Sequence, residues 1–191
     1  LLDIKESNNG TITVKQEGVV TSQRYFESGT TLEISATANL GYTFVAYLGN
    51  YALESQTFAL TLTAPTEIDA VFESKKVTVS ISASDEANCS TSHSSNVDGI
   101  KFIVGDKIHI EYTINELYSL NYILTNASGE FNRNLASQDY IITPLDAEEG
   151  EIHFIANTFK TLSEIKVEIS GYGIVQIGTE VFTSYKVLNL K

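Results

Sequence analysis

The 191-residue sequence has one cysteine, Cys89, and neither tryptophan nor methionine. A single cysteine cannot form a disulfide within the chain, which excludes a small disulfide-stabilised domain. No apolar run is long enough to span a bilayer, and no signal-peptide pattern is present, so we expect no membrane insertion by these residues. Proline is also scarce: only Pro65 and Pro144 occur.

Positive charge is in short supply as well. The chain carries 12 Lys and Arg against 24 Asp and Glu, a formal net charge of −12. Nucleic-acid binding needs clustered cations that displace counterions from phosphates, and none cluster here, which excludes nucleic acid as a partner. An anionic membrane surface would repel the chain for the same reason. We expect an exposed, soluble monomer, for which cationic partners, calcium and neutral polymers remain compatible.

What the sequence does have is alternation of apolar and polar residues with the period of a β-strand. Leu32, Ile34 and Ala36 alternate with polar neighbours, and many later stretches repeat the pattern. Helical spacing is confined to short turns around Tyr51–Ser55 and Asn132–Ser137. The sequence therefore predicts an all-β or β-rich α+β fold, built from tandem small β-grasp-like or β-sandwich-like domains with little helix.

The strand patterns also recur as a set. We align Ile12–Val14 with Val77–Ile81 as the openings of two passes, and Gly29 with Gly105 as later landmarks. Gly29 precedes Pro65 by 36 residues, and Gly105 precedes Pro144 by 39. Such self-similarity indicates an internal repeat.

This alignment predicts the domain boundaries. Residues 1–75 form a first β repeat domain, and residues 76–160 form a second, divergent one with a long Ser-rich loop at 82–99. Residues 161–191 are either closing strands of domain two or the start of a third repeat. Loop insertions are tolerated because the entropy of loop closure grows only slowly with length.

The first pass resembles the divergent internalin-type B repeat of bacterial cell-surface proteins. The features that carry the resemblance are Gly29-Thr30, Tyr42, Phe44, Gly49, Thr63-Ala64-Pro65 and Val71-Phe72. It covers about residues 10–73 well and 77–159 weakly, and Tyr47 stands where the family often has tryptophan. The resemblance implies a small β-grasp-like unit, used in tandem as an extracellular stalk or adhesive module, with no catalytic residues to carry over.

Few residues suggest chemistry. Cys89 and His93 have the spacing of a zinc-ligand pair, but a zinc site needs three or four ligands and no second pair is present. His109 and His153 occupy polar phases of strands and are expected to face solvent. The acidic stretch 146–151 lacks the ligand spacing of a calcium loop, so we expect a solvated turn and leave calcium binding open. We predict no catalytic residues, no metal and no cofactor, although carboxylates paired only in space would escape notice.

Tyrosines are the remaining candidates. Tyr47, Tyr51, Tyr118 and Tyr122 lie in corresponding aromatic stretches of the two passes and would form a binding patch if exposed.

The leading hypothesis is a non-catalytic extracellular repeat module of a bacterial surface protein, acting as a spacer, a stalk or an adhesion module. Its export signal and anchor would lie outside these residues, and its partners would be host or cell-wall polysaccharide or protein. The alternative is a carbohydrate- or protein-binding recognition domain that uses exposed tyrosines and the 82–99 loop. An enzyme fragment and a structural protein of a phage or filament are further alternatives.

Overall fold

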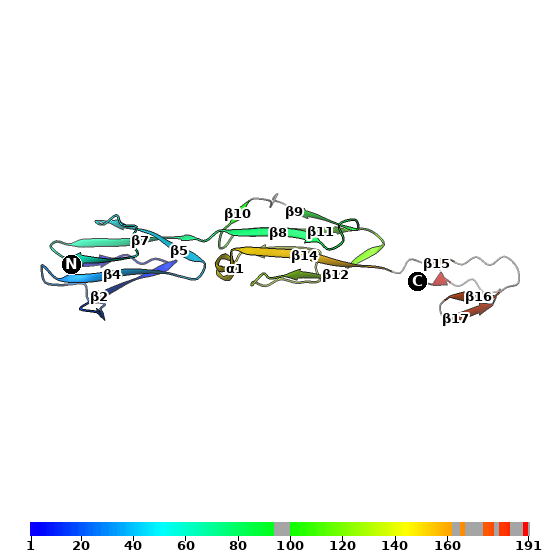
Figure 1. Ribbon diagram of the computed structural model, residues 1–191, viewed down its shortest axis with the longest axis horizontal. Coiled ribbons are helices and arrows are strands. Elements are labelled where there is room, and N and C mark those ends of the chain that lie inside the picture. Colours follow the sequence, from blue (N-terminus) through cyan, green and yellow to red (C-terminus); the bar gives the residue numbers. More distant parts are fainter. Residues whose placement is uncertain (94–99, 162–164, 167–173, 178–179, 184–188, 191) are drawn as a thin grey trace.

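The computed structural model describes residues 1–93, 100–161, 165–166, 174–177, 180–183 and 189–190, with side chains described for 1–91 and 100–161. Almost all regular structure in these residues is β-strand, which confirms the prediction of a β-rich fold with little helix. The chain builds two sandwiches that lie end to end (Figure 1).

Domain one consists of two facing sheets. Its strands are β1 (Leu2–Ile4), β2 (Gly10–Gln16), β3 (Val19–Val20), β4 (Thr31–Ala38), β5 (Tyr42–Gly49), β6 (Thr57–Thr61) and β7 (Thr66–Ser74). One sheet has the order β1-β7-β5, with β1 parallel to β7, and the other has the order β3-β2-β4-β6. Inward side chains of both sheets, such as Ile68 and Ile34, form one core. Of the two architectures left open by the sequence, domain one therefore has the sandwich.

Domain two repeats this plan. Its elements are β8 (Val77–Ala83), β9 (Cys89–His93), β10 (Lys101–Phe102), β11 (Lys107–Ile114), β12 (Tyr118–Thr125), β13 (Ser137–Ile141), α1 (Pro144–Glu149) and β14 (Glu151–Lys160). One sheet has the order β10-β8-β14-β12, with β8 parallel to β14, and the other has the order β13-β11-β9. Its core shares no residue with that of domain one.

The shared topology makes β1, β2, β4, β5, β6 and β7 equivalent to β8, β9, β11, β12, β13 and β14. Gly29 and Gly105 precede equivalent strands and both have a positive φ, of 92° and 90°. The alignment of Ile12–Val14 with Val77–Ile81 is wrong, because Val77–Ile81 belongs to β8, which pairs in parallel with the last strand of its domain as β1 does. The equivalent of β2 is β9, which lies inside the stretch 82–99 that was expected to be a loop.

The helix lies elsewhere than expected. Neither Tyr51–Ser55 nor Asn132–Ser137 is helical, whereas Pro144–Glu149 forms α1. Thr143 caps the helix in a capping box with Asp146, and Pro144 occupies the first turn, where a missing N–H costs nothing. Gly150, with φ 79°, ends it in the left-handed conformation.

The last segment has four short described strands, β15 (Ile165–Lys166), β16 (Ile174–Ile177), β17 (Glu180–Thr183) and β18 (Asn189–Leu190). β15 pairs with β18, and β16 pairs with β17. Most of 161–191, and residues 94–99 of the Ser-rich stretch, lie outside the described residues, so the two interpretations of this segment both stay predictions.

Candidate functional site at the junction between the domains

The connection between the domains is very short. β7 ends at Ser74 and β8 begins at Val77, which leaves only Lys75 and Lys76 between two strands that belong to different cores. Val77 is fully buried in domain two. A connection of two residues permits little relative motion of the domains unless their facing ends separate.

The facing ends touch through the β4–β5 turn of domain one and α1 of domain two. The backbone N–H of Gly41 donates to Oε2 of Glu148 over 3.3 Å. Lys75 joins the same group: its Nζ lies 2.7 Å from Oε1 of Glu148, and its backbone N–H donates to the carbonyl of Gly41 over 2.9 Å. One carboxylate therefore bridges the turn and the connection.

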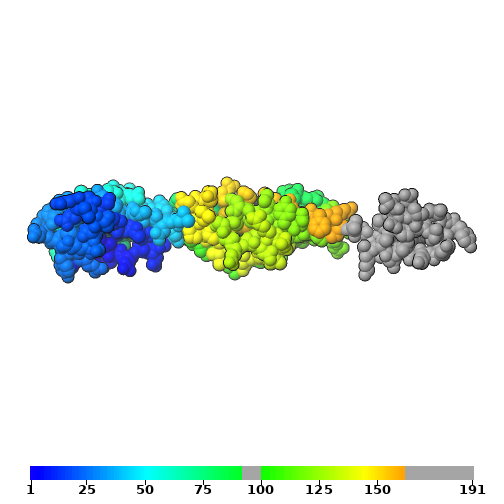
Figure 2. Space-filling model, turned by 90° about the horizontal axis from the view of Figure 1, so that it is seen from below, coloured from blue at the N-terminus to red at the C-terminus, as the bar shows by residue number. Residues whose placement is uncertain are grey.

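Gly41 is required at this position for two reasons. Its φ of 80° lies in the left-handed region, which side chains with a Cβ rarely adopt. A Cβ on Gly41 would also lie 2.5 Å from the carbonyl oxygen of Pro144 and 2.8 Å from its Cα. The absent side chain thus allows the turn to pack directly against the first turn of α1. In Figure 2 the described parts of the two domains form one continuous surface at this place.

A second contact involves Ser74, the last residue of β7. Its Oγ accepts a hydrogen bond from the backbone N–H of Val104 over 2.9 Å and donates to the carbonyl of Lys75 over 3.0 Å. Val104 belongs to the turn between β10 and β11. Two separate parts of domain two, α1 and this turn, therefore hold the end of domain one.

The junction is charged at neutral pH. The hydrogen bond from Lys75 and the N–H of Gly41 lower the pKa of Glu148 below its ordinary value. The side chains of Lys75 and Glu148 are 37% and 40% exposed, so salt screens this pair and it adds orientation more than stability.

The predicted tyrosine patch is not one surface. Tyr47 is fully buried, with its ring 4.9 Å from that of Phe44 and 5.0 Å from that of Phe58, and its hydroxyl donates to the carbonyl of Gln56. Burial raises the pKa of Tyr47 to about 12. The expectation that Tyr47 could be an exposed binding residue is wrong, because its ring is part of the core of domain one.

The other three tyrosines differ in exposure. Tyr51 is half-buried and lies 5.8 Å from the ring of Phe58, and Tyr118 is half-buried on β12. Tyr122 is 42% exposed on the same strand. A binding role for these residues stays a prediction, and Tyr122 is the most accessible of the four.

The structure also shows where the candidate zinc ligands Cys89 and His93 lie. Cys89 is buried, and burial together with the charge of Asp85 raises the pKa of its thiol. Cys89 and His93 both lie on β9, and four residues of extended strand span about 13 Å, too far for the backbone to bring both to one zinc ion. Among the described residues, no group of three or more His, Cys, Asp or Glu side chains is placed to hold a metal ion.

The acidic stretch 146–151 is not a solvated turn. It contains the end of α1, and Asp146 is only 2% exposed. The Asp146 carboxylate accepts hydrogen bonds from the hydroxyl of Tyr140, from the N–H and hydroxyl of Ser128, and from the N–H and hydroxyl of Thr143. Protein donors inside domain two therefore occupy the Asp146 carboxylate.

Sequence reasoning missed the junction residues Gly41, Ser74, Lys75 and Glu148. A partial signal existed, because Lys75-Lys76 separates two alternating stretches and therefore marks a boundary. No pattern along the chain indicates that residues 41 and 148 meet, since that contact depends on how two finished domains are oriented.

The segment that ends with this connection has a recognisable family. Residues 2–76 match the divergent InlB B-repeat domain. The match stops at Lys76, the last residue before β8, so it covers the first sandwich and its connection. The expected resemblance is confirmed for domain one, and this B-repeat domain indicates a repeat module of a bacterial surface protein.

Comparison with curated proteins and with solved structures found no match. In the described part of the chain, no helix is long and apolar enough to cross a membrane.

Proposed function

We propose that the chain is a non-catalytic spacer of a bacterial surface protein, which holds what it carries at a set distance and direction. The observation that carries the proposal is the junction, where a two-residue connection, the Glu148 bridge and the Ser74–Val104 hydrogen bond join the B-repeat domain to domain two. Figure 1 shows the long axes of the two sandwiches in line.

Bending at this junction has a physical cost. Rotation of domain two away from the β4–β5 turn breaks the bonds that Glu148 makes to Gly41 and Lys75. Rotation in the opposite sense drives Gly41 into the backbone of Pro144, with which it is already in close contact. Contacts on both sides of a short connection favour one orientation over many, which is what a stalk needs.

Further support for a non-catalytic role comes from the one thiol. Catalytic cysteines react as thiolates and sit in accessible, electropositive places. Cys89 is buried and its pKa is raised, which favours the unreactive thiol.

The spacer role is tested by measuring the distance distribution across the junction. Spin labels at Ala59 and Glu116, both exposed and in different domains, are introduced as cysteines in a Cys89→Ala background, and the full chain is studied by double electron–electron resonance. We expect one narrow distribution. A broad distribution in the unmodified junction would rule out a stiff spacer.

A matched pair of variants sharpens the test. Glu148→Ala removes the bridge and is expected to broaden the distribution, whereas Glu149→Ala removes an exposed neighbour on α1 and is expected to leave it unchanged. Equal broadening in both variants would count against the role assigned to Glu148.

Recognition of a carbohydrate or protein is a second candidate function. One observation favours it: Tyr122 is 42% exposed, on the same sheet as the exposed ring of Phe159. Both candidates place the chain on the bacterial surface.

A further inference from the structure

The outer face of the β10-β8-β14-β12 sheet in domain two carries Lys101 and Glu151 at the end near α1, where both flank Thr78, and the exposed rings of Tyr122 and Phe159 toward the other end. Strand alternation places Ser80 and Ser82 of β8, His153, Ile155, Asn157 and Phe159 of β14, and Ser119, Tyr122 and Leu124 of β12 on this side. We call these nine residues the aromatic face. Tyr122, Leu124 and Phe159 are 42%, 46% and 49% exposed, so large apolar groups meet solvent there.

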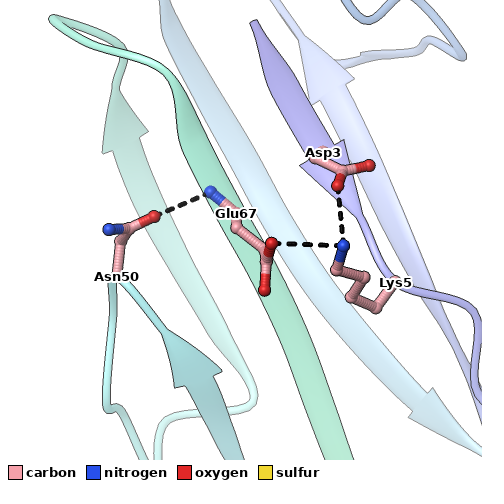
Figure 3. Close-up of polar contacts among 4 residues, drawn as sticks. All are labelled: Asp3, Lys5, Asn50 and Glu67. Atoms are coloured by element: carbon pink, nitrogen blue, oxygen red, sulfur yellow. Dashed lines mark hydrogen bonds and ion pairs between the residues drawn. The ribbon is translucent and has the colours of Figure 1, made fainter.

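The equivalent face of domain one is charged. Asp3 and Lys5 lie on or just beyond β1, and Glu67, Asp69 and Glu73 lie on β7. Lys5 pairs with Asp3 at 2.8 Å and with Glu67 at 3.1 Å, and Asn50 accepts the backbone N–H of Glu67, as Figure 3 shows. Leu48, at the position equivalent to Leu124, is likewise 46% exposed, so the two faces differ in these charged groups and in the rings of Tyr122 and Phe159.

The strand registers allow a position-by-position comparison. In both domains a bulge interrupts the pairing of the equivalent strands, between Phe44 and Ala46 and between Leu120 and Tyr122. The bulges align β7 with β14, and the parallel pairings β1–β7 and β8–β14 then align β1 with β8. In this alignment Asp3, Lys5, Glu67, Asp69 and Glu73 correspond, in that order, to Ser80, Ser82, His153, Ile155 and Phe159. Ala46 corresponds to Tyr122. None of the five positions that are charged in domain one carries Asp, Glu or Lys in domain two, although the whole chain has a net charge of −12.

Folding does not require this change. The sandwich forms in domain one with a charged face, so Tyr122 and Phe159 are not needed to build the sheet. Exposing them costs solubility, and a contiguous exposed apolar patch on a soluble domain commonly marks a binding surface.

The chemistry of the face selects the partner. Lys101 and Glu151 lie on this same side at the end of the sheet near α1. The nine residues of the aromatic face include no Asp, Glu, Lys or Arg, so neither a polyanion nor a cationic partner would find its counter-charge among them, and the net charge would repel a polyanion. Protein interfaces are enriched in Arg beside their aromatic residues, and none of the nine residues is Arg. What remains is aromatic rings interleaved with Ser hydroxyls and an Asn amide. Sugar rings offer the matching groups, with C–H faces that pack on aromatic rings and hydroxyl edges that hydrogen-bond.

The shape of the face favours a chain over a small molecule. Tyr122 lies opposite Asn157, two residues from Phe159 on the neighbouring strand, with the bulge at Asn121 between their levels. Such diagonal neighbours in a regular ladder are about 7–8 Å apart along the backbone. Two rings at this separation on an open sheet surface suit successive units of an extended polymer, whereas small ligands bind in concave pockets.

We propose that the aromatic face of domain two binds an uncharged polysaccharide, with Tyr122 and Phe159 stacking on sugar rings and Ser82, Ser119 and Asn157 contacting hydroxyls. The proposal rests on the recognition function given above and is independent of the spacer role, because Tyr122 and Phe159 lie toward the end of the sheet that is remote from α1.

The test is affinity electrophoresis of the full chain in native gels that contain one soluble polysaccharide each. The neutral probes are hydroxyethyl cellulose, xyloglucan, mixed-linkage β-glucan, galactomannan and dextran, and polygalacturonate is the anionic control. We expect retardation by at least one neutral polymer and none by polygalacturonate. No retardation by any neutral probe would overturn the proposal.

Variants tie the binding to the face. Tyr122→Ala and Phe159→Ala should each weaken the retarding interaction about tenfold, and Phe159→Glu, which installs the charge found at the equivalent Glu73, should abolish it. Tyr25→Ala is the matched control, because Tyr25 is 72% exposed in domain one, away from the face. Thermal melts check that each variant folds, and the two Phe159 variants report independently of Tyr122. Retardation that survives all three changes would overturn the proposal.

Sedimentation velocity tests the alternative that the aromatic face binds a second copy of this chain. If the chain self-associates and Tyr122→Ala abolishes that association, the face is an interface between copies and the polysaccharide proposal fails. Loss of spacer stiffness in the distance measurement would leave the binding result untouched, so the two proposals can fail separately.

Discussion

The two domains have the same backbone plan and different interiors. In each domain an Asn directly after an equivalent strand, β4 or β11, is bound by the residue directly before β2 or β9: the N–H of Asn39 donates to the carbonyl of Asn9, and the N–H of Asn115 donates to the carbonyl of Asn88. The chain also leaves each domain in the same way, because the N–H of Lys75 donates to Gly41 as that of Thr161 donates to Leu117. Main-chain geometry is thus repeated both where the side chains match, as at the two Asn pairs, and where they differ, as at Lys75 and Thr161.

The interiors differ most before the last strand. Domain one joins β6 to β7 by a short turn at Pro65, whereas domain two inserts α1 and the Asp146 network. Asp146 is the only buried charged residue in the described part of the chain. The comparison shows that the region before the last strand of this sandwich can be stabilised by apolar packing alone or by a buried, hydrogen-bonded carboxylate.

Removal of that carboxylate should have the largest effect. Asp146→Ala leaves the buried hydroxyl of Tyr140 and the partly buried donors of Ser128 and Thr143 without this acceptor. We expect domain two to lose about 3 kcal/mol of unfolding free energy while domain one keeps its own. Hydrogen exchange of backbone amides reports each domain separately. Asp139→Ala, at an exposed carboxylate beside Lys107, is the control and should change little. A uniform loss of protection in both domains would show that they do not unfold separately.

Low pH should also destabilise domain two more than domain one, because it protonates Asp146. Burial raises the pKa of Asp146, but the hydrogen bonds from Tyr140, Thr143 and Ser128 outweigh burial, so the pKa in the folded state lies below its ordinary value. The stabilisation is therefore present above about pH 4, the unfolded value, and is lost as the pH falls through the lower folded value.

We expect the exchange protection of domain two to fall below pH 4 earlier than that of domain one. Urea titrations of the full chain at pH 7 and pH 3, followed by exchange, would measure this. Equal acid sensitivity in the two domains would contradict the role given to Asp146, and the Asp146→Ala chain should show a smaller difference between the two pH values.

Gly41→Ala tests the place where the domains meet. A positive φ makes alanine unfavourable by about 1 kcal/mol, and here the new Cβ also meets the backbone of Pro144. We expect both a lower melting temperature and a broader label-to-label distance distribution. Gly29→Ala is the matched control, because Gly29 has φ 92° with no atom within 4 Å of the added Cβ. It should lower the melting temperature without affecting the distances.

The smallest effects are expected from two buried hydroxyls. Tyr47→Phe removes the hydrogen bond to Gln56 and should lower the unfolding free energy of domain one by about 1 kcal/mol. The hydroxyl of Tyr112 in domain two has no hydrogen-bond partner among the residues that the structure describes. Tyr112→Phe should therefore leave domain two unchanged or stabilise it slightly. Equal losses in the two variants would show that Tyr112 has a partner after all.

Much of the fold was predictable because strand alternation is a local property. The β-rich class and the equivalence of Gly29 with Gly105 follow from such patterns, whereas the similar spacing of Pro65 and Pro144 does not make them equivalent, because the strand registers align Pro65 with Glu151. The helix α1 was missed although its signal was present: Thr143, Pro144 and Asp146 have the spacing of a capping box with proline in the first turn.

The start of the second repeat was placed incorrectly for a non-local reason. β8 is equivalent to β1 because each pairs in parallel with the last strand of its domain, β14 or β7. The alternation of apolar and polar residues within a strand does not indicate which strand it pairs with. The pattern of β8 is therefore as compatible with β2 as with β1.

The sequence by itself determined that this protein is a β-rich tandem repeat, since period-2 alternation and repeated turn residues act within a few residues of chain. Tertiary structure decided which tyrosines are accessible. The bulges at Val45 and Asn121 reverse the alternation in β5 and β12, so that Tyr47 enters the core and Tyr122 faces outward. It also decided that Gly41 and Glu148 meet, because contacts between two folded domains depend on their orientation and not on any local pattern.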